Sequence, residues 1–169
     1  MPADDDLRAE LAATAARLIA EEGCDYAQAK RRAVAELLGD ARTAPVPDNA
    51  AVEREVRRYL RLFEPDSHPR LLAGLRRVAS SVMERLAFFE PHLTGAVLNG
   101  TATEHSDIHL HLYVDSAKDV EVFLLDAGVE FEVDEGPPDE RPRMLERLSF
   151  LAPAPRDLGL PRQLDRRSE

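Results

Sequence analysis

Residues 95–115 read GAVLNGTATEHSDIHLHLYVD, and this stretch decides how the chain is interpreted. Two glycines, Gly95 and Gly100, stand ahead of a segment in which polar and apolar residues alternate from 107 to 114. Because successive side chains of a strand point to opposite faces, the alternation predicts a strand with one apolar and one polar face. The apolar face comprises Ile108, Leu110 and Leu112, and the polar face comprises Asp107, His109 and His111.

The segments on either side of this strand predict further short elements. Residues 94 to 98 form an apolar run that we interpret as a strand, and Asp115 is expected to cap a short helix. Residues 129 to 133 and 144 to 151 are two more predicted strands. Mixed short strands with few helices between them favour an α+β fold, in which N-terminal helices pack against a small mixed β-sheet.

The first half of the chain has the periodicity of helices. The aspartates at 4 to 6 are predicted N-caps of a first helix. We expect this helix to end at Gly23, because glycine is common just after the last residue of a helix. Asp25 is expected to cap a second helix that stops at Gly39. The short connection between them predicts a helical hairpin over residues 1–42.

A linker and two more helices are predicted over residues 43–93. Asn49 is the expected cap of a helix from about 50 to 63, whose buried stripe includes Val52, Val56, Tyr59, Leu60 and Phe63. A fourth helix is expected to start at Ser67, and its apolar stripe runs through Leu86 and Phe89. Residues 94–152 would then form the core domain, and 153–169 a loosely ordered tail.

The charge of the chain limits its partners. The net charge is −10, and residues 104 to 140 hold twelve acidic side chains against one lysine. A chain with this excess of negative charge repels polyanions, so its overall charge does not predict nucleic-acid binding. One exception is a row of arginines on one helix face: Arg54, Arg57, Arg58 and Arg61. Either this row contacts phosphate groups, or it is a solvated face neutralised by Glu53 and Glu55.

The composition also indicates where the protein resides. The sequence contains no apolar run of about 18 residues, so neither a transmembrane helix nor a membrane partner is expected. The start of the chain, MPADDDLRAE, lacks the basic and apolar regions of a secretory signal. The single cysteine, Cys24, cannot form an internal disulfide. Together these features predict a cytoplasmic protein.

The stretch from 95 to 115 resembles the signature of the DNA polymerase beta-like nucleotidyltransferases, in which G-S-x-x-x-G precedes S-D-hydrophobic-D-hydrophobic. Gly95 and Gly100 fall on the two glycines, Ser106 on the serine and Asp107 on the first metal-binding aspartate, without an insertion. The helical part is similar to that of bacterial proteins that carry this domain behind a helical extension. The resemblance implies a nucleotidyltransferase-like α/β core within residues 94–152.

The family's chemistry follows from this resemblance. It implies that a nucleoside monophosphate moves from a triphosphate to an acceptor, with Mg²⁺ ions held between carboxylates at alternate positions of one strand. A third carboxylate is expected to orient the nucleophile. Glu132 is the candidate, and Glu146 on the last predicted strand is an alternative. The implied nucleotide-binding residues are Gly95, Ala96, Asn99, Gly100 and Ser106.

Two substitutions depart from the family pattern. Ala96 stands where the family has serine, and His109 stands where the second aspartate belongs. Imidazole is a poor ligand for Mg²⁺, so Mg²⁺ binding at Asp107 and His109 is expected to be weak or absent. The sequence therefore predicts a non-catalytic descendant, with a degenerate active site, that binds a nucleotide or, through its helices, a protein partner.

Two alternatives stay open at this point. The first is an active Mg²⁺-dependent nucleotidyltransferase that uses Asp107 and Glu132. The second is a module for a transition metal, because imidazole suits Zn²⁺, Cu²⁺ or Ni²⁺. Its ligands would come from His105, Asp107, His109 and His111.

Overall fold

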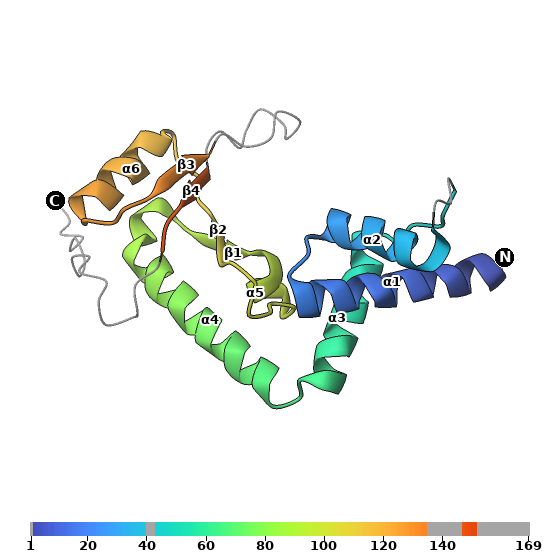
Figure 1. Cartoon of the computed structure of the whole chain (residues 1–169). Helices are drawn as coiled ribbons and strands as arrows, with labels where there is room; N and C mark the ends of the chain where they lie inside the picture. The colour runs from blue at the N-terminus through green and yellow to red at the C-terminus, as the bar shows by residue number, and fades with distance from the viewer. Residues whose placement is uncertain (1, 40–42, 135–146, 152–169) are drawn as a thin grey trace. The chain divides into compact units, whose positions relative to one another are not determined.

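The computed structural model of the chain describes residues 2–39, 43–134 and 147–151 (Figure 1). These residues form an α+β fold that is mostly helical, with two sheets of two strands each. The elements are α1 (Pro2–Glu22), α2 (Tyr26–Leu38), α3 (Asn49–Phe63), α4 (Ser67–Arg85), the 3₁₀ turn η1 (Ala87–Phe89), β1 (His92–Thr94), α5 (Gly95–Asn99), β2 (His109–His111), α6 (Ala117–Asp126), β3 (Glu132–Asp134) and β4 (Arg147–Ser149).

The chain divides into two compact units. Unit 1 consists of residues 1–76 and 94–109, and unit 2 of residues 77–93 and 110–169. The segment from Gly95 to His109 therefore belongs with the N-terminal helices, whereas the sequence analysis grouped it with the following core. Each unit is described below by itself.

Unit 1 has a core built between α1, α2 and α3, in which α1 packs against both other helices. Small side chains on α1 and α2, such as Ala15 and Ala33, are fully buried, which lets the helix backbones approach closely. Leu11, Leu18 and Leu60 are large residues in this core and are almost inaccessible to solvent. The buried stripe predicted for α3 is confirmed at Val52, Val56 and Leu60.

Two aspartates cap the second and third helices. The Asp25 carboxylate accepts a hydrogen bond from the Gln28 N–H at 2.7 Å, as predicted. In α3, the Asp48 carboxylate accepts from the Ala51 N–H at 2.6 Å, so the predicted cap at Asn49 was wrong by one residue. Asp48 has the extended backbone that a cap requires, whereas Asn49 is already helical.

Two other expectations for the helices were wrong. α1 begins at Pro2, so Asp4 and Asp5 lie inside its first turn, where carboxylates still stabilise the positive end of the helix. Phe63 is the last residue of α3 and is 67% exposed, although its ring contacts Tyr59 with 4.5 Å between centroids. The apolar pattern of α3 thus extends one turn beyond the buried core.

The predicted strand at residues 94 to 98 is a helix, α5. A short apolar run fits either structure, and here the flanking glycines decide. Gly95 has φ +69° and Gly100 has φ +77°, so each occupies the left-handed region that interrupts a strand and brackets a short helix. Strand β1 lies directly before Gly95 and pairs with β2, which spans only three residues of the predicted 107–114 strand.

Unit 2 has a separate core formed by α4, η1 and α6. Val82, Leu86, Phe89, Val120 and Leu124 are buried in it. Leu86 and Phe89 were expected on α4, but α4 ends at Arg85: Leu86 lies between α4 and the 3₁₀ turn, and Phe89 is the last residue of that turn. The Phe89 ring meets the Phe123 ring edge-on, with 5.4 Å between centroids.

The last strands are shorter than predicted. β3 and β4 pair antiparallel, with Glu132 opposite Ser149 and Asp134 opposite Arg147. The cap of α6 is Ser116, so the prediction of Asp115 was wrong by one residue. The start of the strand predicted at 144 and the tail predicted at 153–169 lie outside the described residues. No helix among the described residues is long and apolar enough to cross a membrane.

Candidate functional site

The N-terminal end of α5 lies against His109. A Cβ atom added to Gly95 would stand 3.4 Å from Cδ2 of the His109 ring. The Thr94 hydroxyl also donates to the His109 carbonyl oxygen at 3.5 Å. Glycine is therefore favoured at 95 by its positive φ, and the His109 ring lies at van der Waals distance from the place a side chain would occupy.

Asp107 and His109 are both exposed, whereas Ile108 between them is half-buried. This alternation agrees with the predicted polar and apolar faces. Asp107 lies in extended chain just before β2, and His109 is the first residue of β2. The two residues predicted as metal ligands are thus both accessible, and His109 lies at the Gly95 end of α5.

The opposite end of α5 is held by two arginines. The Arg76 guanidinium donates to the Val97 and Leu98 carbonyl oxygens, at 3.1 and 3.0 Å. The Arg57 guanidinium donates twice to the Asn99 carbonyl oxygen, at 3.3 Å each. The last carbonyls of a helix have no partner within the helix and carry its negative dipole end, so cations there are favourable. These contacts fasten α5 to α3 and α4.

Polar side chains complete this attachment. The Asn99 amide donates to the Glu53 carboxylate at 3.3 Å, and Glu53 also pairs with Arg57. On α2, Tyr26 is hydrogen-bonded to the buried Thr101, and burial, followed by the Glu53 charge, raises the pKa of Tyr26. The side chain of Asn99 therefore serves the attachment of α5 rather than facing the Gly95 end.

Ser106 closes a turn between α5 and β2. Its hydroxyl oxygen accepts from the Thr103 N–H at 2.9 Å, and its own N–H donates to the Thr103 carbonyl at 3.0 Å. Such bonding by serine is a common way to reverse the chain. The preceding residue, His105, packs against Gly23 at the end of α1. Its Nε2 atom lies 3.6 Å from Oε1 of Glu104.

The predicted site residues are thus brought together only in part. Gly95 and His109 are in contact, with Asp107 two residues from His109, whereas Asn99 and Gly100 lie at the other end of α5. Glu132 is exposed on β3 in unit 2, so its place relative to Asp107 stays a prediction. The half-buried Ala96 accepts the Thr101 N–H through its carbonyl at 2.9 Å.

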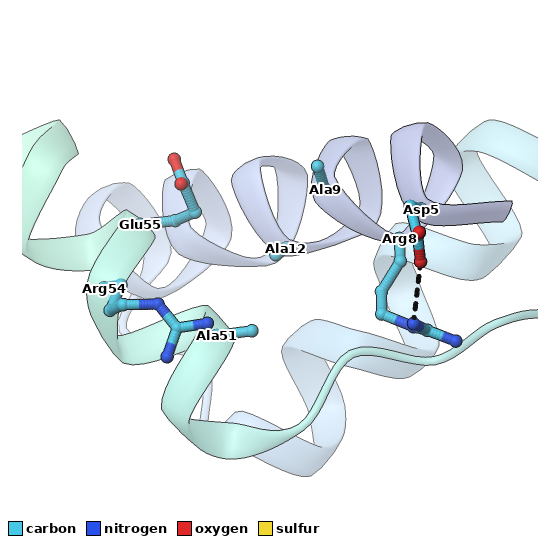
Figure 2. Close-up of a pocket in the computed structure, with 7 residues that line it drawn as sticks. All are labelled: Asp5, Arg8, Ala9, Ala12, Ala51, Arg54 and Glu55. Carbon is cyan, nitrogen blue, oxygen red and sulfur yellow. Dashed lines mark hydrogen bonds and ion pairs between the residues drawn. The ribbon is translucent and has the colours of Figure 1, made fainter. Parts of the chain in front are cut away.

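The four arginines of α3 that were predicted to share one face have different surroundings. Arg57 is turned to α5, and Arg58 lies 3.8 Å from Glu55. Arg54 lines a cavity of about 190 Å³ between α1 and α3, whose floor is formed by Ala9, Ala12 and Ala51. Arg8 lines the same cavity and forms an ion pair with Asp5 (Figure 2), with 3.2 Å between nitrogen and oxygen. Two guanidinium groups and two carboxylates therefore balance the charge around this cavity.

The described residues contain no group of side chains suited to a metal ion, and no similar protein was found. Within the part of the chain that the structure describes, no three histidine, cysteine or acidic side chains lie close enough together to hold a metal ion. Protein-family models, curated proteins and solved structures were compared with the chain, and none of them matches it.

The sequence analysis did not single out Arg76, and it placed Arg57 on a solvent-facing row. Replacing Arg76 with leucine is expected to speed hydrogen exchange of the Gly100 and Thr101 amides, which bond to Ala96 at the end of α5, by about tenfold. Bonds from a charged donor are worth about 1.5–3 kcal/mol, and exposure to solvent reduces this to roughly 1.4 kcal/mol here. Exchange measured by NMR should stay unchanged in Arg77→Leu, which alters the next residue of α4. Equal exchange in both variants would contradict the role given to Arg76.

Proposed function

We propose that this chain is a nucleotidyltransferase-like protein that no longer catalyses transfer and that binds a nucleotide beside Gly95. The proposal includes a sheet of nucleotidyltransferase type, of which the pair β1–β2 would form part. The observation that carries the proposal is the contact between the Gly95 turn and the His109 ring. In the family pattern, the position of His109 holds the second metal-binding aspartate.

The exchange of carboxylate for imidazole changes which ligand the site favours. Two neighbouring carboxylates repel a phosphate group unless Mg²⁺ lies between them. Imidazole carries no negative charge and offers a ring nitrogen as a hydrogen-bond partner, so it does not repel phosphate. One carboxylate, Asp107, and one imidazole do not fit the octahedral oxygen shell that Mg²⁺ prefers. A nucleotide would therefore bind here with little help from Mg²⁺.

A binding experiment tests this proposal. Titration of each common nucleoside triphosphate is expected to give affinities that differ less than about twofold between Mg²⁺ and EDTA. In His109→Asp, the second carboxylate should make nucleotide binding depend on Mg²⁺ by roughly 10–100-fold, by analogy with the loss of other metal-site partners. Adding Asp107→Ala to that variant should remove the dependence. His92→Asp, an exposed histidine on β1, is the matched control and should behave as wild type.

The same proteins decide against the proposal in two ways. If no nucleoside triphosphate binds the wild type in either buffer, the nucleotide site is refuted. If the wild type transfers a labelled nucleoside monophosphate to an acceptor with Mg²⁺ or Mn²⁺, and Asp107→Ala does not, the chain is an active enzyme. Transfer that arises only in His109→Asp would support the lost-activity proposal directly.

A further inference from the structure

Among the described helices, α3 and α6 each expose a pair of large apolar side chains to solvent. At the end of α3, Leu62 is 63% exposed and Phe63 is 67% exposed. On the outer side of α6, Val122 is 55% exposed and Leu125 is 63% exposed. Single exposed apolar residues are common, but adjacent pairs on one element deserve an explanation.

The two pairs are flanked by opposite charges. Arg58 and Arg61 are exposed beside Leu62 and Phe63, and these four residues are here called the basic surface. Arg58 has one acidic neighbour, Glu55, at 3.8 Å, and the Arg58 side chain is 68% exposed. An ion pair this long and this exposed contributes little, so the guanidinium group stays available to a stronger partner.

On α6, the apolar pair lies between carboxylates. Asp119 and Asp126 are exposed and stand three residues before Val122 and one residue after Leu125. The exposed Lys118 shares this face, and α6 as a whole carries three carboxylates against this one lysine. Positions 119, 122 and 126 follow the spacing of one helix face, which is opposite to the buried Val120 and Leu124. Asp119, Val122, Leu125 and Asp126 are here called the acidic surface.

We propose that the basic surface of one copy of this chain docks on the acidic surface of a second copy. Each surface finds its complement in both apolar character and charge on the same kind of chain, so no other partner has to be supplied. This inference goes beyond the proposed nucleotide binding and does not rest on it. Because the two surfaces differ, the contact produces rings or open chains of molecules, or a two-fold dimer where both contacts form between the same two copies.

The contact is expected to be transient. Each surface consists of four side chains, which is far smaller than the roughly 800 Å² per partner of a stable interface. Association should therefore become visible only in concentrated solution, on the order of 0.1–1 mM. Sedimentation velocity over such a concentration series should give an average mass that rises above the 18.8 kDa of one chain.

Two variants separate the two surfaces. Leu62→Glu places a carboxylate in the basic surface and leaves the acidic surface intact, and Leu125→Glu does the reverse. Each variant alone is expected to remain at the mass of one chain at every concentration. An equimolar mixture should form a species of twice that mass and no larger, because only one matched pair of surfaces exists in it. Val46→Glu adds the same charge at another exposed apolar residue and should associate as wild type.

Circular dichroism confirms that each variant is folded before it is compared. Three results would overturn the proposal. The first is a wild-type chain that keeps the mass of a monomer throughout the series. The second is association of either single variant to the wild-type extent. The third is a mixture in which the two variants do not pair, which would point to a surface that binds its own kind.

Discussion

Replacing Gly23 with alanine is expected to lower the free energy of unfolding by roughly 2–5 kcal/mol. Gly23 has φ +68°, where a side chain costs about 1–2 kcal/mol. The new Cβ would also stand 2.7 Å from Cβ of His105, closer than atoms can approach. Since His105 Cβ is fixed by its backbone, either α1 or the turn before β2 must shift, which adds about 1–3 kcal/mol.

Gly128→Ala provides the matched control for this prediction. Gly128 also follows a helix and has φ +69°, but among the described residues outside its own chain neighbours no atom lies within 4 Å of the added Cβ. Only the backbone cost of about 1–2 kcal/mol should appear in this variant. Urea denaturation of both variants measures the difference, and equal losses would show that the contact between Gly23 and His105 does not matter.

Leu60→Ala is expected to lower the free energy of unfolding by about 2–5 kcal/mol, the range found when a buried leucine is truncated. Leu60 is 1% exposed and packs in the core of unit 1 with α1. Truncation removes apolar contacts and leaves a cavity that well-packed helices fill only in part.

Leu62→Ala lies on the same helix and serves as the control. Its side chain is 63% exposed, so its truncation should change the free energy of unfolding by less than about 0.5 kcal/mol. Both values follow from urea denaturation of the full chain. A loss below 1 kcal/mol for Leu60→Ala, or equal losses in the two variants, would contradict the core described for unit 1.

Sequence reasoning succeeded where the deciding interaction is local. Asp25 and Gly39 bound α2 through hydrogen bonds and a positive φ within a few residues, so their roles could be predicted. It failed at residues 94–98, because three apolar residues in a row fit a strand and a helix equally well. The outcome there depends on the conformations of Gly95 and Gly100, which the residue types permit but do not dictate.

The candidate site shows the same limit. Exposure of Asp107 and His109 followed from alternation along one segment, and it could be predicted. The arginines that hold α5 could not be found, because the groups they bind are backbone carbonyls, which carry no residue identity. Glu132 belongs to another unit, and spacing along the chain does not specify how two units are arranged.

The attachment of α5 has a consequence for anyone who trims this protein. A fragment that began at residue 94 would keep the whole glycine and histidine motif, yet it would lack the guanidinium groups of residues 57 and 76. Three carbonyl oxygens would then depend on water alone, and five helical residues are too few to persist without outside support. The helical extension is therefore part of the smallest piece in which the motif keeps its shape.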